Sequence, residues 1–263
     1  MQRFALRLEY DGTGFVGWQR QDNGLSLQQV LEEAAAHLTG GAPVSSVVAG
    51  RTDAGVHAVG QVAMIALPKP ITPDRLRDAL NFHMKPHRLT VLQAAAAPDG
   101  WNPRFSAIGR TYRYTILNRR ARPALDADRV WHVPSPLDIA AMENAATFLL
   151  GHHDFTSFRA VACQAKSPVR TLERLDIIRQ EDRITVTTAA RSFLHHQVRN
   201  MVGTLKLVGE GAWPASRVAT ALAARDRAAA GPTAPASALC LVAVTYPDDP
   251  FAPPDFPPAA VPG

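Results

Sequence analysis

Apolar and polar residues follow two different periods along the chain, and these periods predict its strands and helices. Residues 4–10 alternate, with Phe4, Leu6, Leu8 and Tyr10 on one side and Ala5, Arg7 and Glu9 on the other, which is typical of a half-buried strand. Further strands are predicted at 44–48, 61–67, 88–97, 111–117, 170–179, 183–191 and 239–246. Apolar residues three or four apart predict helices at 26–38, 72–80, 135–150 and 216–225, the first three capped by Ser26, Thr72 and Ser135.

The order of these elements predicts an α+β fold. Residues 1–103 run strand, helix, strand, strand, helix, strand, which indicates helices on one face of a mostly antiparallel sheet. From about residue 100 the composition changes, and the second half repeats the plan of the first. We therefore expect two similar domains, 1–103 and 104–247, and a Pro-rich tail at 248–263 with too few apolar residues to fold by itself.

The stretch at 49–57 lies between two predicted strands and carries charged residues bracketed by glycines. Gly50 and Gly55 permit a tight turn or the close approach of a partner, and Arg51 and Asp53 point the same way if the segment is extended. Turns at strand ends often carry catalytic groups. The alternative is a surface turn with a solvated ion pair.

Gly12, Gly14 and Gly17 follow the first strand with the spacing of a dinucleotide-binding fingerprint. That fingerprint needs a helix that begins among the glycines and presents its N-terminus to a pyrophosphate. Here a polar loop continues to Gly24, and the first helix begins only at Ser26. We therefore expect no nucleotide cofactor.

The formal charge of +5 and the pI near 9.6 favour an anionic partner such as nucleic acid. No acidic residue lies between Asp99 and Asp126, where arginines and aromatic residues are interleaved: Arg104, Arg110, Arg113, Arg119, Arg120 and Arg122 with Trp101, Phe105, Tyr112 and Tyr114. Basic groups for phosphates beside aromatic faces for bases suit an RNA-binding groove. The alternative is an ordinary surface strand with arginines on its solvent-exposed face. Strand alternation puts Arg113 on the face opposite both tyrosines, of which one can be core and the other functional.

A second candidate segment covers residues 193–206. Its apolar stripe on a helical wheel is Leu194, Val198, Met201, Val202 and Leu205. Arg199 lies at the edge of that stripe, one turn before Gly203, and is a candidate partner for a buried carboxylate. The alternative is a surface arginine whose stem packs on the protein.

The histidines and cysteines do not indicate a metal site. The histidines at 83 and 87 straddle a proline. Residues 151–159 are predicted to form a polar loop. Its cluster at 152–154 consists of adjacent residues, which seldom converge on one ion, so we expect these residues to pack at the helix end and within the loop. Cys163 and Cys240 lack zinc spacing and indicate a reducing compartment. Since no apolar run approaches membrane-spanning length and the chain starts with a predicted strand, we expect a cytoplasmic protein.

Seven short blocks of sequence, spread over most of the chain, carry most of its candidate chemistry. They are YDGTGFVGWQ at 10–19, GRTDAGVH at 50–57, RFSA at 104–107, YRY at 112–114, DFTSF at 154–158, VRNMVG at 198–203 and LCLVAV at 239–244. Together they closely resemble the tRNA pseudouridine synthase A family, from about residue 3 to about residue 247. The resemblance implies two similar α+β domains whose sheets join around a central basic cleft, and a homodimer that holds a tRNA.

The resemblance also implies a reaction and its residues. Uridines 38, 39 and 40 of the tRNA anticodon stem-loop would be isomerised to pseudouridine without cofactor or metal. By matching blocks, Asp53 is the catalytic aspartate, Arg199 its ion-pair partner and Tyr112 the aromatic residue that stacks on the flipped-out uridine. Arg51 matches a basic residue beside the aspartate, and further substrate contacts are expected from Arg110, Arg113, His57 and Phe158.

A carboxylate removed from water needs a neighbouring cation to stay ionised, which gives a physical reason for Arg199 on an apolar helix. The chain departs from the family pattern at Ala238, where a glycine is usual, and at 84–86, where Leu-Pro is common. The first departure affects the local shape of a pocket wall and the second an RNA-facing loop. Two other functions stay open at this point: a tRNA-binding protein without catalysis, and a nucleotide-dependent oxidoreductase.

Overall fold

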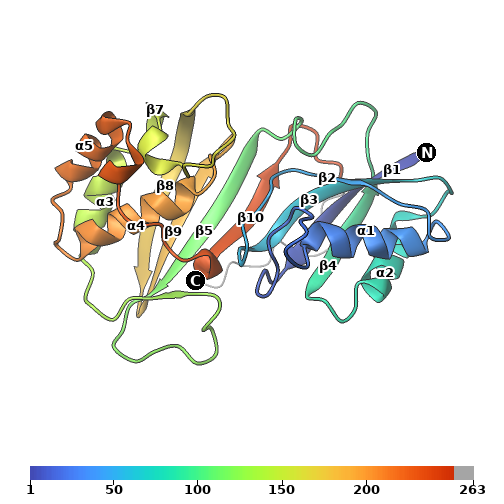
Figure 1. Ribbon diagram of the computed structural model, residues 1–263, viewed down its shortest axis with the longest axis horizontal. Helices are drawn as coiled ribbons and strands as arrows, with labels where there is room; N and C mark the ends of the chain where they lie inside the picture. The colour runs from blue at the N-terminus through green and yellow to red at the C-terminus, as the bar shows by residue number, and fades with distance from the viewer. Residues whose placement is uncertain (252–263) are drawn as a thin grey trace. The chain divides into compact units, whose positions relative to one another are not determined.

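The computed structural model describes residues 1–251 and divides the chain into two compact units (Figure 1). Unit 1 comprises residues 1–108 and the chain from Leu241 onward, and unit 2 comprises residues 109–240. Both are α+β with mostly antiparallel strands, as predicted. The predicted domain boundaries at 103/104 and 247/248 stay predictions. Among the described residues, none of the helices has the length and apolar character needed to cross a membrane.

Unit 1 is built on an antiparallel sheet with strand order β4-β1-β3. β2 and β10 also pair with β3. The elements are β1 (Gln2–Tyr10), α1 (Leu27–His37), β2 (Ser46–Val48), β3 (His57–Leu67), α2 (Pro73–His83), β4 (Leu89–Ala96) and β10 (Leu239–Thr245). Figure 1 shows α1 and α2 on the same side of this sheet, to which Phe4, Leu6 and Leu8 contribute completely buried side chains.

β1 is half-buried as predicted, with Arg7 half-buried and Glu9 exposed on its second face, but the Ala5 end of that face is covered. Ala5 is completely buried there in a cluster that includes Trp101, Tyr246 and Phe251. The guanidinium of Arg7 lies 4.5 Å from the centre of the Phe251 ring. The chain after β4 and the chain after β10 thus cover this face. Phe251 belongs to the predicted Pro-rich tail, whose residues 252–263 lie outside the described part of the chain.

Unit 2 contains an antiparallel sheet with strand order β5-β9-β8-β7, and β6 pairs in parallel with β5. Its strands are β5 (Gly109–Leu117), β6 (Trp131–His132), β7 (Gly151–Asp154), β8 (Val169–Gln180) and β9 (Arg183–Ala190). Its helices are α3 (Ile139–Thr147), α4 (Gln197–Gly209) and α5 (Ser216–Ala224), with short 3-10 turns η1 (Thr156–Phe158), η2 (Arg227–Ala229) and η3 (Ala236–Ala238). Figure 1 shows α3, α4 and α5 gathered on one side of β8 and β9.

Local side-chain chemistry corrects one of the predicted helix caps. The Ser26 hydroxyl accepts from the Gln29 amide at 3.1 Å, as predicted. Ser135, however, does not cap α3. Asp138 does, because its carboxylate accepts from the Ala141 amide at 3.0 Å, and a carboxylate cap satisfies an N-terminal donor as well as a hydroxyl does.

Two boundaries around the candidate chemistry also differ from prediction. α4 begins at Gln197 after His196, whose φ is 64°, so Leu194 precedes the helix although it is buried. The segment 151–159 was predicted to be a polar loop, but it forms β7 and η1 because β7 pairs with the edge of β8.

Candidate active site

The turn that carries Asp53 connects two paired strands. β2 pairs with β3 up to Val48, and the Ala49 amide donates to the Val62 carbonyl at 2.8 Å. The Val56 amide then donates to the Asp53 carbonyl at 3.1 Å, which closes the turn. The predicted turn at a strand end is confirmed, although β3 begins already at His57.

The glycine loop, residues 11–18, packs its backbone directly on this turn. A Cβ atom at Gly12 would lie 2.2 Å from the Val56 carbonyl oxygen, and one at Gly17 would lie 2.7 Å from the Thr52 carbonyl oxygen. The Trp18 amide donates to that same Thr52 carbonyl at 3.0 Å. The glycines at 12 and 17 therefore serve close backbone approach to the Asp53 turn, and α1 begins only at Leu27.

A buried polar network holds the turn from the sheet side. The Tyr10 and Thr52 hydroxyls lie 2.8 Å apart. The Gln61 side chain, completely buried, donates to the Tyr10 hydroxyl at 3.2 Å and to the Gly50 carbonyl at 2.8 Å. Gly50 and Thr52, the residues on either side of Arg51, are therefore held by hydrogen bonds from side chains that are themselves buried.

The charged residues of the turn differ in exposure. Arg51 is exposed and Asp53 is half-buried.

His57 faces the glycine loop. Its Nδ1 atom lies 3.1 Å from the Gly12 amide nitrogen and 3.1 Å from an Asp11 carboxylate oxygen. A neutral ring accepts from the amide at this atom, whereas a protonated ring donates to the carboxylate. Asp11 also pairs with Arg88 at 3.0 Å. His57 thus links the start of β3 to the glycine loop in either protonation state.

In unit 2, β5 distributes the predicted aromatic and basic residues over its two faces. Tyr114 is completely buried, while Tyr112 is half-buried and meets the Phe193 ring edge-on, with centroids 5.3 Å apart. Arg110 shares their side of the strand and donates to the Arg191 carbonyl at 2.6 Å, and Arg113 has the opposite parity. Of the two tyrosines, Tyr114 is therefore the core residue.

Arg199 lies on the first turn of α4, half-buried, and is held by the loop that follows η2. Its Nε donates to the Ala234 carbonyl at 2.8 Å, and the Ala234 amide donates to the Arg199 carbonyl at 3.1 Å. The Tyr114 hydroxyl donates to the neighbouring Pro235 carbonyl at 2.9 Å. Burial raises the pKa of Tyr114 far above its usual value, and the positive charge of Arg199 opposes that rise only in part. The phenol therefore stays a neutral donor.

Phe158 is completely buried and packs against Phe155, with ring centroids 6.2 Å apart. The neighbouring polar residues of β7 make separate local contacts: His153 lies 2.6 Å from the Leu150 carbonyl and Asp154 accepts from Thr156. The structure therefore supports the packing role expected for this segment.

The predicted site lacks three residues that the structure connects to it: Gln61, Asn200 and Arg227. Both amides, Gln61 and Asn200, are completely buried, but Asn200 directly follows Arg199 in a mixed segment, whereas Gln61 is a single polar residue within an apolar stretch. That isolation in an apolar stretch is a usable signal, because a buried amide must find hydrogen-bond partners. Arg227 has no such signal, since it ends the charged triplet 225–227.

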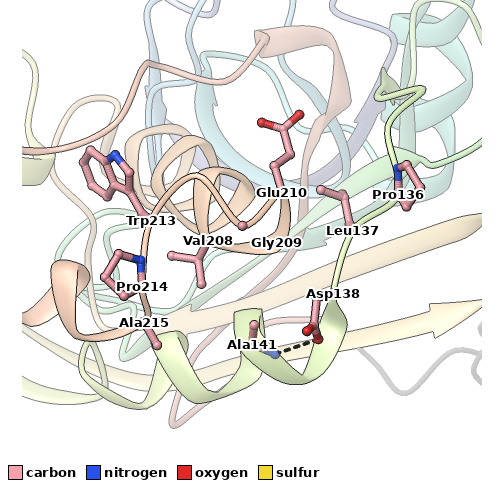
Figure 2. Close-up of a pocket in the computed structure, with 11 residues that line it drawn as sticks. Pro136, Leu137, Asp138, Ala141, Val208, Gly209, Glu210, Trp213, Pro214 and Ala215 are labelled. Atoms are coloured by element: carbon pink, nitrogen blue, oxygen red, sulfur yellow. Dashed lines mark hydrogen bonds between the residues drawn. The ribbon is translucent and has the colours of Figure 1, made fainter.

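A pocket of about 780 Å³ lies elsewhere in unit 2, at the ends of α3 and α4 (Figure 2). Its lining includes Trp213 and two carboxylates, those of Asp138 and Glu210. Asp138 caps α3, and Glu210 accepts from Ser135 at 2.9 Å and pairs with Lys206 at 2.6 Å. The pocket includes none of the predicted site residues.

Comparison with known proteins decides the family. The family model described as tRNA pseudouridine synthase matches residues 8–106 and 145–247. The chain belongs to the tRNA pseudouridine synthase family. It is 67% identical over 252 residues to tRNA pseudouridine synthase A of Acidiphilium cryptum (strain JF-5), covering 95% of this chain and 99% of that protein. It is 57% identical over 246 residues to the protein of the same name from Rhodospirillum centenum (strain ATCC 51521 / SW), covering 94% and 100%.

Membership of the tRNA pseudouridine synthase family makes the chain an isomerase. This favours the enzyme over the non-catalytic binding protein and over the oxidoreductase. Both matched segments of the family model include candidate residues: Asp53 lies in the first and Arg199 in the second.

Proposed function

We propose that this enzyme isomerises uridine to pseudouridine at positions 38, 39 and 40 of the tRNA anticodon stem-loop, with Asp53 as its catalytic carboxylate and no cofactor. Arg199 is proposed as the ion-pair partner of Asp53, and Tyr112 as the platform for the flipped-out base. The observation that carries the proposal is the fixed, half-buried Asp53 on a turn held by the glycine loop and by Gln61, in a chain of this family.

The reaction breaks the bond between uracil N1 and ribose C1′, turns the base, and joins C5 to C1′. The proton of C5 is lost and N1 gains one, so the overall change is an isomerisation. A carboxylate held in place stabilises or captures the electron-poor intermediate. A guanidinium such as that of Arg199 keeps a partly desolvated carboxylate ionised.

The target uridine is stacked within the RNA, so it must leave the stack before it can react. Unstacking costs a few kcal/mol, and stacking on an aromatic side chain offsets about 1–3 kcal/mol of it. Tyr112 suits this role because it is half-buried, whereas Tyr114 is not accessible. Arg51, Arg110, Arg113, His57 and Phe158 are proposed to support the bound nucleotide, Phe158 through packing beneath the site since its side chain is completely buried.

Asp53→Asn tests the proposal. We expect retained tRNA binding and no pseudouridine by carbodiimide primer extension on transcripts whose anticodon arm has uridine only at 38, 39 or 40. Asp99→Asn is the matched control, because the Asp99 carboxylate is fully exposed in the same unit, and it should keep full activity. Full activity of Asp53→Asn would refute the catalytic role. Modification of uridines outside positions 38–40 would refute the site specificity alone.

The proposal also includes a basic cleft that holds the tRNA, a homodimer and a cytoplasmic location, all of which the family resemblance implies. Light scattering of the purified enzyme tests the dimer. The salt dependence of tRNA affinity tests the basic surface, since each phosphate contact contributes nearly one unit to the slope of log affinity against log salt. A flat salt response would contradict the assignment of arginines to phosphates.

A further inference from the structure

We propose that Arg227 is a positioning residue that orients the guanidinium of Arg199, an inference that rests on the proposed role of Arg199 in catalysis. Both residues lie in unit 2, Arg227 at the start of η2 and Arg199 on α4. The connection between them runs through the segment 230–234.

Arg227 uses its guanidinium as a multiple hydrogen-bond donor. One terminal nitrogen donates to the Gly231 carbonyl at 2.9 Å and, more weakly, to the Ala230 carbonyl at 3.4 Å. The other donates to the Asn200 side-chain oxygen at 3.2 Å and to the Thr233 hydroxyl at 3.1 Å. All four acceptors are neutral oxygens spread over two segments, so the geometry of a planar fork matters more here than the charge.

Asn200 connects the hydrogen bonds of Arg227 to α4, next to Arg199. Its side chain is completely buried, donates to the Phe158 carbonyl at 2.8 Å, and accepts from the Thr233 hydroxyl at 2.6 Å. Because both of its polar atoms are engaged, Asn200 gives Arg227 and Thr233 a fixed acceptor one residue from Arg199.

The segment 231–234 then runs along α4 in direct contact with the helix backbone. The Gly231 amide donates to the Thr204 hydroxyl at 2.9 Å. A Cβ at Gly203 would lie 1.8 Å from the Pro232 carbonyl oxygen. Two residues after Pro232, the Ala234 carbonyl accepts a hydrogen bond from Arg199 Nε. Arg227 thus sets the position of the acceptor that fixes the plane of the Arg199 guanidinium.

An alternative role for Arg227 is contact with an RNA phosphate, and two substitutions separate the roles. Arg227→Lys keeps the charge but loses the fork, whereas Arg227→Gln loses both. Positioning predicts that both variants slow single-turnover tritium release from tRNA labelled at uridine C5 by roughly tenfold to a hundredfold, with an unchanged dissociation constant for tRNA. Phosphate contact predicts a normal rate for Arg227→Lys and weaker, less salt-dependent binding for Arg227→Gln, which would overturn the proposal.

Arg225→Lys is the matched control, because the Arg225 side chain is 70% exposed two residues away, and it should keep the wild-type rate. Since Arg227 acts through Arg199, Arg227→Lys should cause no further loss in an Arg199→Lys background. Additive losses would assign Arg227 a merely structural role and overturn the inference. If Arg227→Lys does not fold, Thr233→Val removes one of the hydrogen-bond acceptors of Arg227 and is measured in the same way, with the same two outcomes.

The parent proposal is tested separately by Arg199→Lys alone. A wild-type rate for that variant refutes the catalytic role of Arg199, and the positioning inference falls with it. A slow Arg199→Lys enzyme combined with wild-type rates for the Arg227 and Thr233 variants refutes only the inference about Arg227.

Discussion

The Asp53 turn of unit 1 and the Arg199 helix of unit 2 hold their candidate groups in different ways. Asp53 lies on a turn, where the backbone itself must be fixed, and its supports contact the backbone of Gly50, Thr52 and Val56. Arg199 lies on a helix, whose hydrogen bonds already fix the backbone, and its support contacts the side chain at Nε.

This difference explains the residue types used in each unit. Where one backbone segment packs directly on another, a side chain would not fit between them, and the glycine loop has Gly12 and Gly17 at these contacts. A long side chain fixed by a loop needs multiple donors and acceptors, and unit 2 supplies Arg227 and Asn200. The turn should therefore be sensitive to added volume in the glycine loop, and Arg199 both to lost hydrogen bonds and to added volume at Gly203, where the supporting segment contacts the helix backbone.

Adding a methyl group to the glycine loop should have the largest effect. Gly12→Ala places a Cβ 2.2 Å from the Val56 carbonyl oxygen, and a backbone atom cannot move aside cheaply. We expect a loss of several kcal/mol in the free energy of unfolding, measured in urea, and strongly reduced turnover at 25 °C.

Gly14→Ala is the control in the same loop. Gly14 has a φ of +82° but open space around it, so alanine there costs only the left-handed conformation, about 1–2 kcal/mol. Equal losses in the two variants would mean that conformation, rather than close packing on the Asp53 turn, explains the glycines.

Gly203→Ala is the next largest test and addresses the Arg199 helix. Its Cβ would displace the Pro232 carbonyl and with it the segment that holds Arg199. We expect a destabilisation of about 2–4 kcal/mol and slower turnover. Gly209→Ala, at the end of the same helix, meets the buried Met142 and Leu137 side chains at 2.7 and 3.2 Å. It should cost stability through overpacking but leave turnover unchanged, because it does not touch the segment that holds Arg199. If both variants slowed turnover to a similar extent, the segment 231–234 would not be what positions Arg199.

Much of this architecture is predictable from sequence because it depends on local patterns. Strand alternation, the Ser26 cap and the turn at 49–57 each follow from neighbouring residues. The glycine loop illustrates the limit. The glycine spacing resembles that of a nucleotide site, and the polar loop up to Gly24 argues against one. The actual partner of the glycines, the Asp53 turn, lies about forty residues away in the chain, and no local pattern encodes that contact.

Candidate chemistry divides in the same way. Asp53 and Arg199 follow from motif resemblance, because family blocks preserve reacting groups. Arg227 does not, since an arginine in a charged triplet is usually solvated, and only the structure shows its four neutral acceptors. Ser135 failed as a predicted cap because α3 begins only at Ile139, directly after Asp138, and the Ser135 hydroxyl donates to Glu210 instead.

Tyr10→Phe tests the polar part of the turn support and should have a smaller effect. It removes the hydroxyl that meets Thr52 and Gln61, at a cost of about 1–2 kcal/mol for the lost hydrogen bonds. Turnover should fall several-fold because the Thr52 side of the turn loosens. Tyr246→Phe removes a buried hydroxyl bonded to the Pro103 carbonyl at 2.8 Å and should destabilise equally without slowing turnover. Equal turnover in both variants would make the Tyr10 contact a stability feature only.

The far end of the Arg199 helix should show the smallest effect, and only in stability. Burial tends to raise the pKa of Glu210, but hydrogen bonds from Lys206 and Ser135 outweigh it and hold that pKa below its usual value. A carboxyl with a lowered folded pKa stabilises the protein above its unfolded pKa, near 4.3, and this contribution disappears as the pH falls through the folded pKa. Ser135→Ala should therefore cost about 0.5 kcal/mol at pH 7 and less at pH 3 in urea unfolding. Turnover at pH 7 should be unchanged, because Arg199 is held at the opposite end of α4; a slower enzyme would show that the whole helix, and not only its first turn, positions the arginine.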